Sequence, residues 1–194
     1  FAFVAAVVAF QPELRRALMQ LGQPRIFKGG RGQVQAMVDA LMESVAYLSK
    51  NKIGAVVAIE RSVQLGSLME TGTIMDAHMT ASLLNTIFWP GSALHDMGVV
   101  IREGRIAAAG CQFPLAESDE VDPSLGSRHR AALGLAQDSD AAVVVVSEET
   151  GRISIAYEGQ LYLGLEIDNL RQMLLDLLTT HNHRPRKSRR EGSA

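Results

Sequence analysis

The chain has 194 residues, of which 47% are hydrophobic and 21% are charged, so it can bury one good core and one main domain is expected. Its formal net charge is −2, but residues 181–194 hold five of the 19 basic and one of the 21 acidic residues, which leaves 14 basic and 20 acidic residues elsewhere. An acidic domain argues against nucleic-acid binding, because that function needs a basic surface. The single cysteine, Cys111, excludes a disulfide within these 194 residues.

The two ends of the chain differ in character from the rest. Residues 1–10 form an uninterrupted apolar run, which is too short to span a bilayer and is interpreted as the end of a membrane helix. A buried or interfacial helix start is the alternative. Residues 11–32 predict a short amphipathic helix that stops at Gly22, followed by a linker. Residues 181–194 predict a basic disordered tail, for which solvation is favoured over contact with anionic lipid or nucleic acid.

Helical and strand patterns interleave between these ends. In chain order they predict a helix over 33–49, a strand over 53–60, a helix over 80–88, a hairpin of strands 98–101 and 105–113, a helix over 126–137, strands over 141–147, 151–157 and 159–164, and a helix over 170–178. Gly104 suits the hairpin turn, and Ser127 is the expected N-cap of the third helix. Because the order lacks a strict βαβ alternation, we expect a single α/β domain over 33–180, with a central mixed β-sheet flanked by helices.

Polar side chains stand at the ends of two of these strands. His95 and Asp96 come just before one strand, where a carboxylate is uncommon unless it is paired, solvated or bound to a metal. A solvated aspartate and a structural histidine are the alternatives. Ser147, Glu148 and Glu149 follow a buried strand, where a plain turn is the alternative.

A cluster of cations stands at the start of the third helix. Arg128, His129 and Arg130 lie where the helix dipole disfavours positive charge, so a compensating anion is expected. A phosphate would suit both the exposed amides of the helix and the guanidinium groups. Salt bridges to acidic neighbours such as Asp119 or Glu120 are the alternative.

The order and spacing of six segments resemble the bacterial diadenylate cyclases, which make cyclic di-AMP from two ATP molecules. The segments are GAVVAIER, METGTIMDA, LHDMGVVI, RIAAAGCQFPL, LGSRHRAALG and VVVVSEETGRIS, and they cover about residues 54–163. The apolar start followed by FQPELRRALMQLG further resembles the junction between membrane helices and cyclase domain in the membrane-anchored subfamily. The resemblance implies attachment to the bacterial cell membrane through the N-terminal segment, with the catalytic domain in the cytoplasm.

Two signature motifs carry the implied site. The Arg-His-Arg motif is intact, whereas the Asp-Gly-Ala motif is altered to Asp96-Met97-Gly98, and Phe113 stands where Leu is usual. The resemblance implies that Asp96 activates the ribose 3′-hydroxyl, directly or through a metal. The implied catalytic residues are Asp96, Gly98, Arg128, His129 and Arg130. The implied ATP-binding residues are Gly110, Cys111, Phe113, Ser127, Arg128, His129, Arg130 and Ser147. The implied ligands of a divalent metal, Mg²⁺ or Mn²⁺, are His95, Asp96, Glu148 and Glu149.

The implied reaction condenses two ATP into cyclic di-AMP and two pyrophosphates, and it requires a homodimer because one domain holds one ATP. The alternative is an impaired cyclase-like domain that binds adenine nucleotide or serves as an assembly partner. On the alternation of a strand, Met97 is expected to point away from the site and pack into the core, while Gly98 points into the site.

Overall fold

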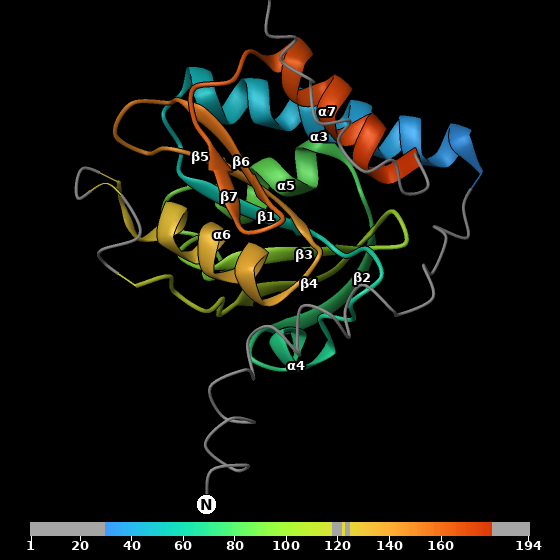
Figure 1. Ribbon diagram of the computed structural model, residues 1–194, viewed down its shortest axis with the longest axis horizontal. Helices are drawn as coiled ribbons and strands as arrows, with labels where there is room; N and C mark the ends of the chain where they lie inside the picture. The colour runs from blue at the N-terminus through green and yellow to red at the C-terminus, as the bar shows by residue number, and fades with distance from the viewer. Residues whose placement is uncertain (1–29, 118–121, 123–124, 180–194) are drawn as a thin grey trace, which may run out of the picture.

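The computed structural model describes residues 30–117, 122 and 125–179, and within them a seven-stranded sheet carries helices on both faces (Figure 1). The helices are α3 (Arg31–Lys50), α4 (Gly66–Met69), α5 (Ala81–Phe88), α6 (Ser127–Asp138) and α7 (Ile167–Thr179). The strands are β1 (Ala55–Ile59), β2 (Thr73–His78), β3 (Gly98–Arg102), β4 (Arg105–Cys111), β5 (Ala142–Val146), β6 (Ile153–Tyr157) and β7 (Gln160–Tyr162). The α/β fold with a mixed sheet is confirmed. The segment expected to end a membrane helix (1–10), the helix and linker up to residue 29 and the tail at 181–194 lie outside the described residues.

The strand order is β2-β4-β3-β1-β5-β6-β7. β1 and β3 run parallel, whereas every other neighbouring pair is antiparallel. β1 and β3 therefore begin at the same edge of the sheet, and β4 and β5 end there. We call this the site edge. It is defined by the residues just before β1 and β3 and just after β4 and β5.

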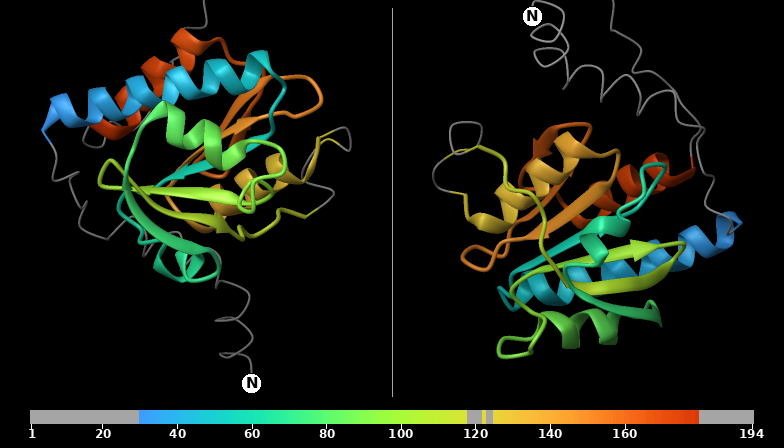
Figure 2. Two further views of the ribbon diagram at one scale, coloured as in Figure 1. Left: turned by 180° about the vertical axis from the view of Figure 1, so that it is seen from behind. Right: turned by 90° about the horizontal axis from the view of Figure 1, so that it is seen from below.

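Alternate residues of the central strands face two separate layers of helix. Val57 and Ile59 belong to the hydrophobic core under α3, α5 and α7, while Val56 and Ala58 pack with residues of α4 and α6. Figure 2 shows this second layer, with α6 across the sheet from α3. Burial on both faces explains why β1 and β5 are continuous apolar runs, as the sequence predicted. Within the described residues, no helix has both the length and the hydrophobicity to cross a membrane.

Two elements were not predicted from the sequence, the short helix α4 and the edge strand β2. In β2 the pairing with β4 shifts register between Ile74 and Ala77, and Asp76 adopts a positive φ of 46°. A bulge of this kind breaks the period of two by which strands are found in a sequence. The side chains of β2 are exposed or half-buried, as expected of the outermost strand of a sheet.

The expected N-cap of α6 was wrong by one residue. Gly126 has extended backbone angles, and its carbonyl accepts hydrogen bonds from the amides of His129 and Arg130, so Gly126 is the cap and Ser127 is the first helical residue. No side chain caps this helix. The hydroxyl of Ser127 is therefore not committed to a cap.

Candidate functional site

The topology brings the predicted site residues to the site edge. Asp96 lies just before β3, Phe113 just after β4 and Ser147 just after β5, and the register pairs Gly98 with Cys111 across β3 and β4. β1 separates β3 from β5, so the two groups of residues stand roughly 10 Å apart across the sheet. The site thus has two halves, one at β3 and β4 and one at β5 and α6.

The second half is a pocket of about 270 Å³, which we call the α6–β5 pocket. It is lined by Leu125, Gly126, Ser127, Arg128, His129, Val146, Ser147, Glu148, Glu149, Thr150, Arg152, Ser154, Leu163 and Gly164. Six of these were predicted as site residues. Arg152 was missed, although the antiparallel hairpin of β5 and β6 places it beside Ser147, whose amide donates to the Arg152 carbonyl at 3.0 Å.

Arg128 is held by an acidic partner inside this pocket. Its Nη1 donates to Oε2 of Glu148 at 2.5 Å, and the Arg128 side chain is only 15% exposed. A Cβ on Gly54 would lie 2.8 Å from Cζ of Arg128 and 2.9 Å from Cβ of Glu148, so the ion pair needs glycine there. The Nε of Arg128 is buried and has no hydrogen-bond partner among the described residues. Asp119 and Glu120, suggested as alternative partners, lie outside those residues.

Burial disfavours a positive charge on His129. It is buried, with Nε2 3.5 Å from Oγ of Ser154. Burial lowers the pKa of His129 below its usual 6.5, and the nearby charge of Glu149 offsets this only in part. A neutral imidazole at the first turn of α6 also avoids an unfavourable interaction with the helix dipole.

Arg130 points to a different part of the chain. Its Nε and Nη2 both donate to the carbonyl of Ala116, at 3.2 and 3.1 Å, and the amide of Ala116 donates to the Arg130 carbonyl at 3.0 Å. Arg130 is absent from the residues that line the α6–β5 pocket. The structure therefore brings Ser127, Arg128 and His129 to the pocket but directs Arg130 onto the segment after β4.

The half of the site at β3 and β4 is closely packed. Cys111 is fully buried, and burial raises the pKa of its thiol to about 11, so the thiol is not available to a ligand. Phe113 is also buried, and its ring lies against Gly98. Gly110 has a φ of +70°, a conformation in which other residues are strained.

His95 and Asp96 lie in a turn that precedes β3. Nδ1 of His95 lies 2.5 Å from the carbonyl of Ser92, a contact in which the ring nitrogen must donate. In the neutral ring this leaves Nε2 as an acceptor, and it faces Oδ1 of Asp96 at 3.2 Å. Two acceptors so close together suit a shared cation, either a proton or a metal ion.

Met97 does not pack into the core, and that expectation was wrong. β3 begins only at Gly98, so the alternation of the strand does not extend back to Met97 in the turn. Its side chain is 46% exposed. Gly98 is buried, because the Phe113 ring covers it.

The proposed metal ligands lie at the two halves of the site. Within the described residues no three His, Cys, Asp or Glu side chains converge on one point. Magnesium is typically held by one or two protein carboxylates together with substrate phosphates and water, so a partial ligand set such as His95 and Asp96 fits a divalent cation.

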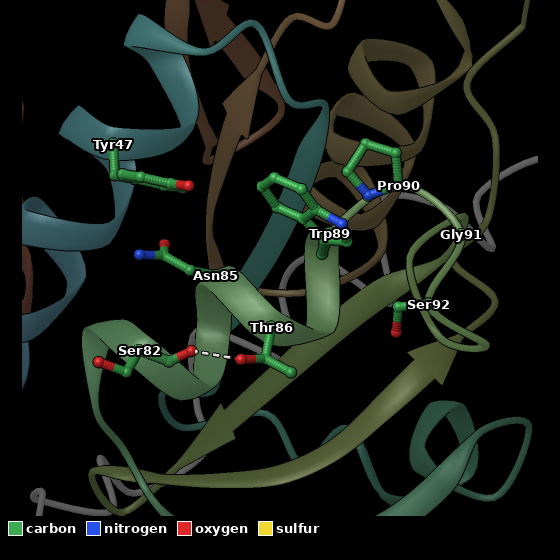
Figure 3. Close-up of a pocket in the computed structure, with 8 residues that line it drawn as sticks. All are labelled: Tyr47, Ser82, Asn85, Thr86, Trp89, Pro90, Gly91 and Ser92. Atoms are coloured by element: carbon green, nitrogen blue, oxygen red, sulfur yellow. Dashed lines mark hydrogen bonds between the residues drawn. The ribbon is translucent and has the colours of Figure 1, made fainter.

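A larger pocket of about 660 Å³ lies on the other face of the sheet, between α3 and the end of α5. It is lined by Tyr47, Ser82, Asn85, Thr86, Trp89, Pro90, Gly91 and Ser92. Figure 3 shows the rings of Tyr47 and Trp89 projecting toward one another with Asn85 near them. None of the predicted site residues lines this pocket, so its greater volume does not make it the candidate site.

Comparison with known proteins gives a consistent answer. Residues 42–161 match the model of the DAC family, described as DisA bacterial checkpoint controller nucleotide-binding. The chain is 42% identical over 176 residues to the cyclic di-AMP synthase CdaA of Bacillus subtilis (strain 168), covering 89% of this chain and 64% of that protein. It is 37% identical over 182 residues to a diadenylate cyclase of Listeria monocytogenes serotype 1/2a (strain 10403S), covering 92% of this chain and 67% of that protein. The chain thus spans about two-thirds of the length of these relatives.

Two solved structures resemble the fold. A double mutant of DacA from Staphylococcus aureus superposes with a TM-score of 0.73 at 36% identity, over 75% of this chain and 97% of that one. A hypothetical membrane spanning protein from Bacillus cereus gives a TM-score of 0.63 at 47% identity, over 66% of this chain and 63% of that one.

Proposed function

The chain belongs to the DAC family, and we propose that it is a diadenylate cyclase, a nucleotidyltransferase that condenses two ATP molecules into cyclic di-AMP and two pyrophosphates. The observation that carries this proposal is the site edge. Along this edge lie an exposed carboxylate, Asp96, and a pocket at the start of α6, where a buried donor of Arg128 has no partner in the described part of the chain.

The chemistry consists of two equivalent transfers. The 3′-hydroxyl oxygen of one ATP forms a bond to the α-phosphorus of the other, the bond from that phosphorus to the oxygen bridging to the β-phosphate breaks, and pyrophosphate leaves. The hydroxyl proton passes to the Asp96 carboxylate or to solvent. Positioning and neutralisation of charge are most of the catalytic work in such a transfer.

The phosphates of ATP are assigned to the α6–β5 pocket. Ser127 and Ser147 offer hydroxyl groups, and Arg128 offers the charge and the unused Nε donor. Adenine is assigned to the other half of the site, where backbone groups of Gly110 and Cys111 can read the edge of the base beside Phe113. The separation of the two halves by one strand leaves room for the ribose between them.

A divalent cation, Mg²⁺ or Mn²⁺, belongs to this proposal. Its candidate ligands are His95 and Asp96 in one half of the site, and Glu148 and Glu149 in the other. When bound, the cation lowers the pKa of the hydroxyl group and screens the phosphate charges. The facing acceptors of His95 and Asp96, 3.2 Å apart, are the feature of this chain that favours it.

The active form is proposed to be a homodimer with two site edges face to face. One domain holds one ATP, so the attacking hydroxyl must come from the ATP of the partner. The 77% exposure of the Asp96 side chain leaves it accessible to that second nucleotide. Attachment to the bacterial cell membrane through the N-terminal segment, with the domain in the cytoplasm, is proposed from the sequence resemblance and from the name of the Bacillus cereus structure.

The direct test is incubation of the purified chain with ATP and either Mg²⁺ or Mn²⁺, followed by chromatography of the nucleotides. We expect cyclic di-AMP, with two pyrophosphates for each molecule formed. Conversion of ATP to ADP would contradict the proposal. ATP binding without any product would instead identify the chain as a binding or assembly module.

A further inference from the structure

The Arg130 side chain donates hydrogen bonds to the protein backbone and does not line the α6–β5 pocket. We propose that Arg130 is a positioning residue, which ties α6 to the segment after β4 and so fixes the adenine half of the site relative to the phosphate half. The inference rests on the proposed function, because it assigns Arg130 a part in the same site. It separates Arg130 from Arg128, although the two belong to one motif.

The contact between α6 and this segment is specific in geometry. Nε and Nη2 lie on one edge of the guanidinium, and both donate to the single carbonyl of Ala116, while the Ala116 amide returns a hydrogen bond to the Arg130 carbonyl. Lysine could not reproduce this, because an ammonium has no fixed pair of parallel donors. Three hydrogen bonds thus join residue 130 to residue 116.

One turn further along α6, Gly134 extends the same contact. Residues four apart share a face of a helix, so Gly134 follows Arg130 toward the segment. A Cβ on Gly134 would lie 2.4 Å from the Pro114 carbonyl oxygen and 2.7 Å from the Ala116 amide nitrogen. The helix therefore lies directly on the backbone of residues 114–116, with no side chain in between.

The contact between α6 and residues 114–116 influences the adenine half of the site through Phe113. Phe113 is the next residue before Pro114, and its ring lies against Gly98 at the start of β3. The same helix, α6, also carries Arg128, which lines the α6–β5 pocket. One helix thus contacts both halves of the site. Arg130 links it to the adenine half by hydrogen bonds, beside the packing of Leu133 on Ala116. Small misplacements between binding groups are costly in catalysis, which gives such a link a measurable effect.

The experiment compares Arg130→Met with Arg130→Lys in the 194-residue chain, and uses Arg152→Met as the matched control. Arg152 lines the α6–β5 pocket, and no ion pair engages its side chain among the described residues. Three quantities are measured at constant ionic strength: amide hydrogen exchange of residues 112–117, calorimetric affinity for inorganic tripolyphosphate without metal, and the ratio of affinities for ATP and GTP.

For Arg130→Met we expect faster exchange of residues 112–117, unchanged tripolyphosphate affinity and a loss of ATP preference over GTP of about tenfold or more. Arg130→Lys should restore part of that preference through a single hydrogen bond. Arg152→Met should show the reverse pattern: tripolyphosphate affinity falls because one positive charge leaves the pocket that Arg152 lines, and the ATP preference is unchanged.

Several outcomes would overturn the inference. Weaker tripolyphosphate binding in Arg130→Met would make Arg130 a phosphate ligand, and unchanged exchange would show that it does not tether the segment. Faster exchange with an unchanged ATP preference, or a parent chain that does not distinguish ATP from GTP, would remove its role in the adenine half. If Arg130→Met fails to fold, Arg130→Lys supplies the same three readouts. Failure of the cyclase proposal is seen separately, as absence of cyclic di-AMP from the parent chain.

Discussion

Gly98 and Phe113 occupy one shared space at the site edge, because a Cβ on residue 98 would lie 2.4 Å from both Cε2 and Cζ of the Phe113 ring. In the Asp-Gly-Ala motif that Asp96-Met97-Gly98 resembles, the third residue is Ala, and Leu usually stands at the position of Phe113. The smaller residue at 98 and the larger ring at 113 therefore compensate each other. The size of residue 98 therefore limits the size of residue 113, and the two positions are coupled in packing.

Gly98→Ala should destabilise the fold by about 1 to 3 kcal/mol, because the added methyl group overpacks a buried site. Phe113→Leu alone should also destabilise it, by opening a cavity. The double variant should be more stable than the sum of the two changes predicts, which chemical denaturation can measure. Gly66→Ala is the control, since a Cβ on Gly66 meets nothing closer than 4.0 Å. Strictly additive effects of the two changes would contradict the shared space.

Glu148→Gln should strengthen the binding of inorganic tripolyphosphate in the absence of metal. In the parent chain a phosphate must compete with the Glu148 carboxylate for Arg128. Glu148 is 59% exposed, so its ion pair contributes about 0.2 to 1 kcal/mol and the gain should not exceed about fivefold. The binding constant is measured by calorimetry.

Glu149→Gln is the matched control for this prediction, because it removes the same charge from the same turn without a hydrogen bond to Arg128 in the structure. When Arg128 is replaced by Ala, Glu148→Gln should raise the tripolyphosphate affinity no more than Glu149→Gln does. If the two substitutions raise the tripolyphosphate affinity of the parent chain equally, the effect comes from the change in net charge and not from the release of Arg128.

The sequence predicted the central strands because these depend on local patterns, whereas the grouping of the α6–β5 pocket residues into one site was implied by the family resemblance. β1 and β5 are apolar runs, and the polar residues directly after β5 and at the start of α6 stand out against them. β2 was missed because its bulge at Asp76 interrupts the alternation. The direction of the Arg130 side chain could not be predicted, since its acceptor, Ala116, depends on where the segment after β4 lies against α6.

The buried histidine should make the fold sensitive to mild acid. Burial lowers the pKa of His129 in the folded chain, so below its usual value of 6.5 the unfolded chain binds a proton that the folded chain does not. The contribution of neutral His129 to the free energy of unfolding is therefore fully present above pH 6.5 and is lost as the pH falls through the lowered pKa. Free energies of unfolding should fall more between pH 7.5 and 5.5 in the parent than in His129→Gln. Equal losses in the two proteins would show that folding does not lower the pKa of His129.

Cys111 should resist alkylation in the native protein. Its side chain is fully buried, so a reagent cannot readily reach the sulfur. Burial also raises the pKa of the thiol to about 11, so little of it is ionised to the reactive thiolate at pH 8. Reaction with iodoacetamide, followed by mass spectrometry, should become fast only when denaturant unfolds the chain. Rapid labelling without denaturant would show that the end of β4 opens readily.

Met97 should slow the reaction through its side chain rather than through its backbone. Met97 is not among the residues of the described chain with a positive φ, so its conformation does not require the glycine of the family motif. Met97 is instead 46% exposed next to Asp96 in the chain, at the edge where the proposed second nucleotide would approach. Met97→Gly and Met97→Ala should therefore raise turnover at saturating ATP to a similar extent.

Tripolyphosphate affinity should stay the same in both variants, because the α6–β5 pocket lies across β1 from Met97. Gly98 is kept in each, since an alanine there would clash with Phe113 and obscure the comparison. The glycine variant should also lose about 0.5 to 1 kcal/mol of stability to the greater freedom of its unfolded chain, which the alanine variant avoids. A rise in turnover in Met97→Gly alone would show that the backbone conformation at residue 97, and not the side chain, slows the reaction. If neither variant is faster than the parent, Met97 does not hinder the reaction.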